Sequence, residues 1–248
     1  MTSVLYEHPL NERIRNYLKL EQLFAQADSC SPDNISNNYH VFFNAIFAIL
    51  GTLERNDIRG ELIKDLERLE QHLVLWSQSP EINSSALEEN LKQTVGLICT
   101  LRSGAPPWAS LRNDKLLSSI KQRFAIQGGS STFDLPQLQF WLNQPVKDVG
   151  ESVEYWLGKL NKLKKSISLI LKFLRQKSDF KTIATEKGFY QDNGEGLLLL
   201  RIKVDNNLQC YPTVSGNRFR YSIRFMLPCE KDGRKYTSDP VEFELARC

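Results

Sequence analysis

The spacing of apolar residues changes near Ser178, and this change constrains the fold more than any other feature of the chain. Before it, apolar residues recur every three or four positions, as they do in amphipathic helices. After it, apolar and polar residues alternate between turn-forming pairs such as Asn193-Gly194 and Asp232-Gly233, as they do in strands. The sequence therefore predicts an α+β protein. We expect a helical domain over residues 1–177, followed by an antiparallel β domain over residues 178–248.

Apolar stripes and start signals divide the helical part into separate helices. Asp57 is placed to begin one helix, and Ser85 with Glu88 has the spacing of a capping box. The segment from Gly104 to Pro107 ends the helix that Ser85 begins, because consecutive prolines cannot continue it. The expected helices cover about residues 14–24, 42–53, 58–76, 85–101, 111–124, 134–142 and 151–177.

The β part contains four segments with strand-like alternation, at residues 197–204, 208–214, 217–227 and 240–245. Near the N-terminus, Val4 to Glu7 is also extended in character and precedes Pro9. We expect residues 4–7 to add a strand to the β domain.

Composition excludes several classes of protein. Of the 248 residues, 41% are hydrophobic and 25% are charged, which is typical of a globular protein and not of a disordered one. No run of 18 apolar residues occurs, and the N-terminus lacks the apolar segment of a signal peptide, so we expect a cytoplasmic protein that does not engage a membrane. The net charge of +3 is too small to indicate a nucleic-acid partner by itself.

No motif for catalysis, a metal or a cofactor is present. The five cysteines are scattered without a Cys-x-x-Cys pair, which favours reduced thiols over a disulfide framework or a zinc site. The three histidines lack the spacing of metal or nucleophile chemistry, and no phosphate-binding glycine motif occurs. We therefore expect no enzymatic activity, no metal and no cofactor.

Residues 218–225 carry the most informative pattern for function. On a strand, alternate side chains point to opposite faces, so the aromatic and aliphatic residues of this segment would enter the core. Those core residues would be Phe219, Tyr221, Ile223 and Phe225, and the opposite face would carry Arg218, Arg220, Ser222 and Arg224. Neighbouring positions on one face are about 7 Å apart, so several guanidinium groups could meet one partner that bears carboxylates or phosphates. This predicts an anion-binding surface, with a solvated sheet face as the alternative.

Several further segments, in the same order along the chain, resemble the ZapD family of cell-division proteins. The segments are Tyr6 to Glu12, Ser131 to Pro136, Gly188 to Gly194, Tyr211-Pro212 and Arg220 to Met226. The resemblance runs from Leu5 to the last residues, so it covers essentially the whole chain.

This resemblance implies a cytoplasmic homodimer without enzymatic activity, built from a helical domain and a β domain. Such proteins bind the C-terminal tail of FtsZ, the tubulin-like division GTPase, and bundle its protofilaments into the Z ring at midcell. A two-fold dimer presents the same patch twice, so it could hold tails from two filaments. Apolar helices such as Phe42 to Leu53 could supply the dimer contact.

The resemblance also implies which residues bind the FtsZ tail. Basic side chains stand at family positions at Arg220, Arg224, Arg55, Lys19 and Lys115. Lysine replaces the charge of arginine but not its two-pronged geometry, so the two lysines would bind less selectively.

Three more residues complete the predicted FtsZ-binding surface. Arg218 and Arg112 are included because they lie near other basic candidates, and Gln139 stands where the family often has histidine. The alternative function is a nucleic-acid-binding module that uses the basic strand 218–224. It is disfavoured because base stacking needs exposed rings, whereas the rings of this strand would face away from the arginines.

Overall fold

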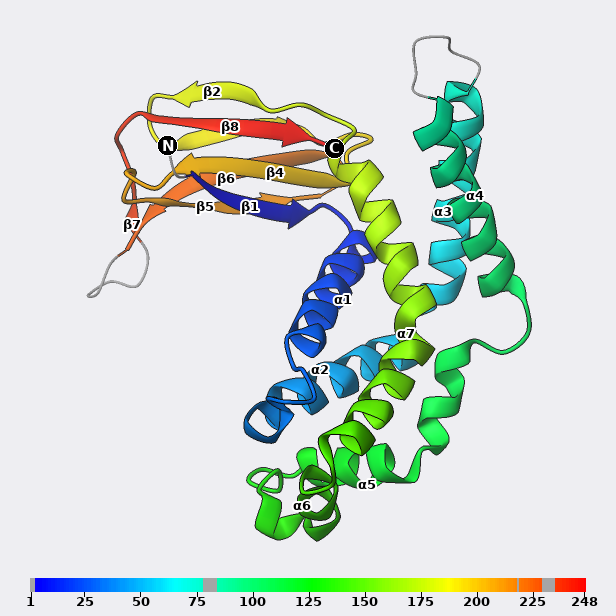
Figure 1. The fold of residues 1–248 in the computed structure, drawn as a ribbon. Coiled ribbons are helices and arrows are strands. Elements are labelled where there is room, and N and C mark those ends of the chain that lie inside the picture. The colour runs from blue at the N-terminus through cyan, green and yellow to red at the C-terminus, as the bar shows by residue number, and fades with distance from the viewer. Residues whose placement is uncertain (1–2, 78–83, 218, 229–234) are drawn as a thin grey trace. The chain divides into compact units, whose positions relative to one another are not determined.

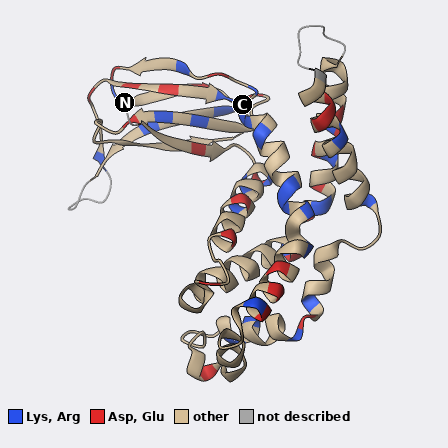
Figure 2. Ribbon diagram, in the orientation of Figure 1, with Lys and Arg blue, Asp and Glu red and all other residues tan. Residues whose placement is uncertain are grey.

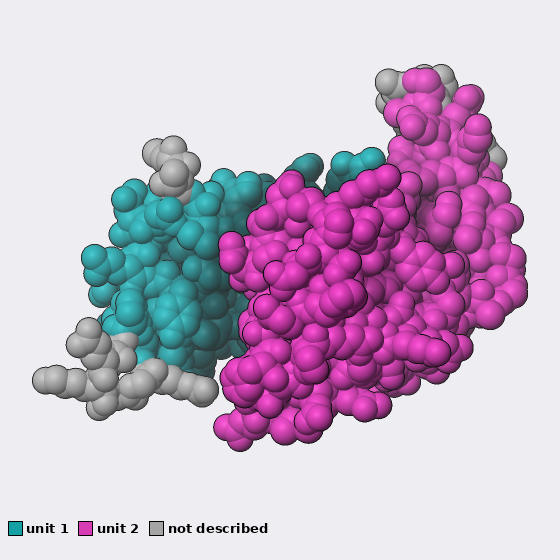
Figure 3. All heavy atoms as spheres, turned by 60° about the horizontal axis from the view of Figure 1, so that its bottom comes forward, with its two compact units in different colours: residues 1–18, 171–248 teal, residues 19–170 magenta. Residues whose placement is uncertain are grey.

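The computed structural model describes residues 3–77, 84–217, 219–228 and 235–248. The chain forms two compact units: unit 1 is Met1–Leu18 with Leu171–Cys248, and unit 2 is Lys19–Ile170. Figure 3 colours the two units separately. Helices dominate the first part of the chain and antiparallel strands the last, so the α+β prediction is confirmed. The sequence analysis assigned residues 1–177 to one domain, whereas unit 1 also includes residues 1–18 and begins again at Leu171.

The structure contains the helices labelled α1 to α7 in Figure 1. Their bounds are α1 Glu12–Asp28, α2 Ile35–Arg55, α3 Ile58–Trp76, α4 Ser84–Arg102, α5 Lys115–Phe124, α6 Pro136–Leu142 and α7 Val146–Arg175, with short 3-10 helices η1 Pro107–Asn113 and η2 Thr132–Asp134. Asp57 caps α3 as predicted, because its carboxylate accepts a hydrogen bond from the Gly60 amide at 3.1 Å. None of the described helices has the length and apolar character needed to cross a membrane.

The predicted helix over residues 111–124 is instead two helices that meet at Asp114. The Asp114 carboxylate accepts hydrogen bonds from the Leu117 amide and from the Trp156 indole, each at 2.9 Å. An N-cap aspartate starts a new helix, so α5 begins at Lys115. The bond to Trp156 also ties the start of α5 to α7 within unit 2.

A cluster of aromatic rings lies among the aliphatic side chains in the core of unit 2. The ring of Phe43 lies 5.6 Å from that of Trp141 and 6.0 Å from that of Trp156, and Phe124 packs against Phe47. Several apolar side chains of α2, including Phe42, Phe43 and Ile46, are at most 1% exposed. These three side chains are thus used for packing within their own unit, and the suggestion that Phe42 to Leu53 supplies a dimer contact stays a prediction.

Unit 1 contains two antiparallel sheets (Figure 1). The strands are β1 Ser3–Pro9, β2 Lys181–Thr185, β3 Phe189–Asn193, β4 Leu199–Asp205, β5 Tyr211–Gly216, β6 Arg220–Leu227, β7 Lys235–Tyr236 and β8 Val241–Arg247. The first sheet has the order β1-β4-β8-β2, and the second has the order β3-β6-β5 with β7 paired to β6. The predicted N-terminal strand is confirmed as β1. Side chains of both sheets, such as Ile202 and Phe225, share one buried core.

A partly buried carboxylate in β1 ties three elements of unit 1 together. Glu7 accepts hydrogen bonds from Arg175 at 2.7 and 2.9 Å and from Arg201, its neighbour on β4, at 3.0 Å. Burial alone would raise the pKa of Glu7, but the hydrogen bonds and charges of the two arginines outweigh it and lower the pKa. Arg201 also donates to the Arg175 carbonyl at 3.0 Å, which fixes the end of α7.

Glu7→Gln is expected to destabilise unit 1 by about 2 kcal/mol at pH 7, because two arginines lose a partly buried anion. Because the pKa of Glu7 is lower in the folded than in the unfolded protein, its carboxylate stabilises the fold at pH values above the pKa of the unfolded state. The difference from wild type should therefore shrink as pH falls below the ordinary value of 4.5, and vanish below the folded pKa. Urea unfolding measured across this pH range tests the effect.

Glu12→Gln is the matched control, because the Glu12 side chain is 74% exposed and pairs with Arg15 of its own helix. Its effect should stay within about 0.5 kcal/mol. Equal unfolding midpoints for Glu7→Gln and wild type at pH 7 would contradict a stabilising role for the contacts of Glu7 with the two arginines.

Candidate functional site

Strand β6 carries the predicted arginine surface, and its position follows from the burial of its other face. Tyr221, Ile223 and Phe225 are at most 1% exposed and belong to the core of unit 1, as predicted. Arg220 and Arg224 alternate with them and are exposed. We call this outward surface of the second sheet the arginine face. Positions four residues apart on a strand are separated by about 13 Å, so the two arginines could contact a short extended segment of a partner.

The prediction for Phe219 is wrong, because this ring is 59% exposed instead of buried. The Asn217 side-chain oxygen accepts hydrogen bonds from the backbone amides of Phe219 at 2.9 Å and Arg220 at 3.2 Å. This turn delays the strand until Arg220, so the alternation does not yet apply at Phe219. Arg218, also predicted for this surface, lies outside the described residues.

Two exposed aromatic rings hold the guanidinium group of Arg224. Its central carbon lies 4.8 Å from the centroid of Phe189 and 5.0 Å from that of Tyr236. Phe189 is the cross-strand partner of Arg224 on β3, and Tyr236 on β7 pairs with Met226, two residues further along β6. Rings at this distance attract and orient a cation without neutralising its charge.

Arg220 lines a polar pocket of about 240 Å³ on the same face. Gln191, Ser215 and Ser222 contribute side chains that can donate or accept hydrogen bonds. Within the part of unit 1 that the structure describes, no carboxylate lies within ion-pair distance of Arg220 or Arg224. Among those described residues, neither cation of the arginine face is held in an ion pair.

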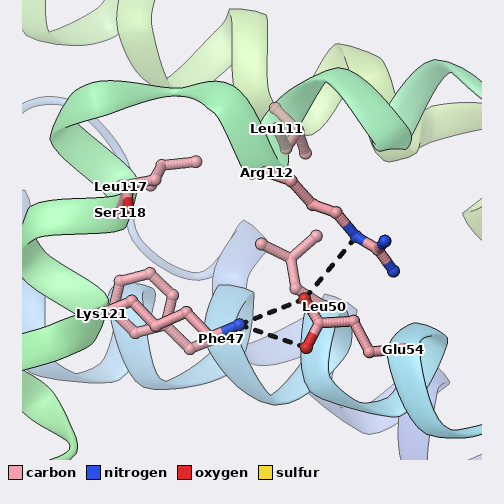
Figure 4. Close-up of a pocket in the computed structure, with 8 residues that line it drawn as sticks. All are labelled: Phe47, Leu50, Glu54, Leu111, Arg112, Leu117, Ser118 and Lys121. Carbon is pink, nitrogen blue, oxygen red and sulfur yellow. Dashed lines mark hydrogen bonds and ion pairs between the residues drawn. The ribbon is translucent and has the colours of Figure 1, made fainter.

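A second basic surface lies in unit 2, around a groove between α2, η1 and α5. The groove has a volume of about 440 Å³, and we call it the α2–α5 groove. Figure 4 shows its lining residues, which are Phe47, Leu50, Glu54, Leu111, Arg112, Leu117, Ser118 and Lys121. Of the predicted residues, only Arg112 lines this groove directly.

Within the groove, two cations converge on the carboxylate of Glu54 (Figure 4). The Lys121 ammonium lies 3.3 Å from both oxygens of Glu54, and Arg112 Nε lies 3.7 Å from one of them. The side chains of all three residues are more than one third exposed. These ion pairs are therefore accessible to water and weak.

The other predicted residues of unit 2 are exposed but are not part of the groove lining. Arg55, at the end of α2, donates a hydrogen bond from Nε to the Gly51 carbonyl of its own helix at 3.0 Å. Lys115 is the first residue of α5, Lys19 lies on α1, and Gln139 lies on α6. The predicted binding residues thus fall into two groups, with Arg220 and Arg224 in unit 1 and the rest of the described ones in unit 2.

Sequence reasoning missed Phe189, Tyr236, Glu54 and Lys121. The first two reach Arg224 through strand pairing, and the last two meet although they are 67 residues apart in the chain. No local spacing could reveal either contact. The sequence shows that Phe189 and Tyr236 are aromatic, but only the structure shows that both rings are exposed.

We searched the described residues for metal-binding clusters and reactive thiols. No cluster of histidine, cysteine, aspartate or glutamate among them could hold a metal ion. Cys30, Cys99, Cys210 and Cys248 form no disulfide, and burial raises the pKa of the Cys210 and Cys248 thiols, which makes them poor nucleophiles. What the geometry provides is cationic surface next to apolar and aromatic side chains, which suits binding of an acidic segment.

Comparison with known proteins places the chain in a family. The family model described as "ZapD: Cell division protein" matches residues 18–224. A cell division protein ZapD from Idiomarina loihiensis is 40% identical over 247 residues, which cover 99% of this chain and 96% of that protein. Its counterpart from Yersinia enterocolitica is 36% identical over 248 residues, which cover 100% of this chain and 98% of the relative. One from Escherichia coli is 35% identical over 247 residues, with 100% and 99% covered. The chain therefore belongs to the ZapD family of cell division proteins.

Proposed function

We propose that this protein is a non-enzymatic cell-division factor that binds the C-terminal tail of FtsZ through the arginine face. As a homodimer in the cytoplasm, it cross-links and bundles FtsZ protofilaments at midcell and so promotes assembly of the Z ring. The observation that carries the proposal is the exposure of Arg220 and Arg224 on a well-packed strand, with no carboxylate of the described chain beside them.

Arg224 lies on a strand, and its side chain is already oriented to bind a flexible peptide. The rings of Phe189 and Tyr236 already orient Arg224, so less side-chain freedom is lost when a carboxylate arrives. A tail bound at micromolar strength corresponds to about −8 kcal/mol and exchanges readily. Many such contacts along two polymers raise the effective concentration, so bundling becomes cooperative without any single site being tight.

A nucleic-acid-binding module is the second candidate, and one observation favours it. The rings of β6 are buried, but neighbouring strands place the exposed rings of Phe189 and Tyr236 beside Arg224. Exposed rings next to a cation can stack on bases. Against this, Figure 2 shows acidic positions as well as basic ones on the strands of the β domain, whereas phosphate binding favours a patch of basic residues. Separate titrations with fluorescent single-stranded DNA and FtsZ tail peptide at near-physiological salt distinguish the two. Tight binding of DNA with no binding of the peptide would reverse the ranking.

Arg220→Glu combined with Arg224→Glu is expected to weaken binding of the FtsZ tail peptide at least tenfold, because two attractive charges become repulsive. The same variant should no longer drive FtsZ polymers into the low-speed pellet. Fluorescence anisotropy and sedimentation measure the two effects, and the far-UV circular dichroism spectrum should stay unchanged because both side chains are exposed.

Lys181→Glu combined with Lys187→Glu provides the matched control, because it makes the same change in net charge at two other exposed residues of unit 1. This control should bind the peptide almost as wild type does. If both double variants lose affinity equally, net charge explains the binding and the arginine face does not.

The homodimer has its own test. Light scattering at working concentration should return twice the chain mass of 28.6 kDa, because cross-linking needs two tail sites on one particle. A mass equal to one chain at concentrations that bundle FtsZ would rule out the two-site mechanism.

A further inference from the structure

The α2–α5 groove combines three features that suit one short piece of acidic peptide. Phe47, Leu50 and Leu117 give it apolar walls, Arg112 and Lys121 give it two cations, and its volume of about 440 Å³ matches a small ligand and not a whole helix. In an otherwise apolar site, a few placed charges fix the orientation of what binds.

We propose that the α2–α5 groove is a second contact site for an acidic peptide, and that Glu54 is its built-in competitor. The peptide would place one apolar side chain between the groove walls and an adjacent carboxylate between Arg112 and Lys121. Glu54 occupies that anion position when no peptide is bound. This inference rests on the proposed function, since the FtsZ tail is the acidic peptide that we expect.

The position of Glu54 in its helix supports the role of a displaceable anion. Glu54 lies in the last turn of α2, which ends at Arg55. The C-terminal end of a helix carries partial negative charge, so a carboxylate there is disfavoured unless external cations compensate. Arg112 and Lys121 supply that compensation from η1 and α5. The contact is thus maintained by the groove and not by the helix itself.

Weak pairing makes the exchange of anions easy. The distance of 3.7 Å between Arg112 and Glu54 is too long for a hydrogen bond, and both Lys121 contacts are 3.3 Å. Exposed pairs of this kind contribute about 0–1 kcal/mol each. An incoming carboxylate that matches the two cations can therefore replace Glu54 at small cost, and the apolar contact of the neighbouring side chain adds the net gain.

The test is a double-mutant cycle on the full chain, with fluorescein-labelled FtsZ tail peptide and anisotropy as the readout. Glu54→Gln should tighten binding about three- to tenfold, because the competitor loses its charge while its shape is kept. In a chain that also carries Arg112→Gln and Lys121→Gln, the further change Glu54→Gln should have no effect. Urea unfolding of each variant checks that the fold is intact. We expect little change, because the side chains of all three residues are more than one third exposed.

Glu67→Gln is the matched control, because Glu67 makes an ion pair with Arg102 elsewhere in unit 2. It should leave peptide affinity unchanged. Unchanged affinity for Glu54→Gln in a chain whose wild type binds the peptide would overturn this inference alone. Wild-type protein that binds no tail peptide would overturn the proposed function together with it.

Discussion

The burial of one face of strand β6 decides where Arg220 and Arg224 point. Tyr221, Ile223 and Phe225 fill the core between the two sheets, so a shift of one residue in register would expose three large apolar side chains and bury the arginines. Each large apolar side chain contributes about 1.5–3 kcal/mol when buried, which far exceeds the cost of holding two like charges on a wet surface. Burial of the core side chains therefore keeps Arg220 and Arg224 on the same exposed face, although their like charges repel each other.

The two basic surfaces hold their cations by different means. On the arginine face, aromatic rings orient Arg224 and leave its charge available. In the α2–α5 groove, Glu54 pairs with both Arg112 and Lys121, so we expect an incoming carboxylate to exchange with Glu54. The first arrangement favours rapid capture of an anion, and the second favours discrimination between ligands.

Local patterns in the sequence predicted much of the fold but only part of the candidate site. Helical spacing, the Asp57 cap and the alternation from Tyr221 to Phe225 depend on neighbours along the chain, and each is present in the structure. Phe219 was placed wrongly because the side chain of Asn217 shapes a turn before the strand begins. The contact of Arg224 with the rings of Phe189 and Tyr236 depends on the register between strands. The pairing of Glu54 with Lys121 depends on how two helices pack. Such contacts join residues distant in sequence, which spacing rules do not encode.

Arginine side-chain NMR tests the central claim most directly, because it observes the cations themselves. The Nε–Hε signals of isotope-labelled protein, assigned by comparison with single Arg→Lys variants, would be followed while unlabelled FtsZ tail peptide is added. The account predicts that the signals of Arg220 and Arg224 shift and saturate together, with the amides of β6 and β3 shifting alongside them. Saturating peptide that leaves both arginine signals in place would contradict it.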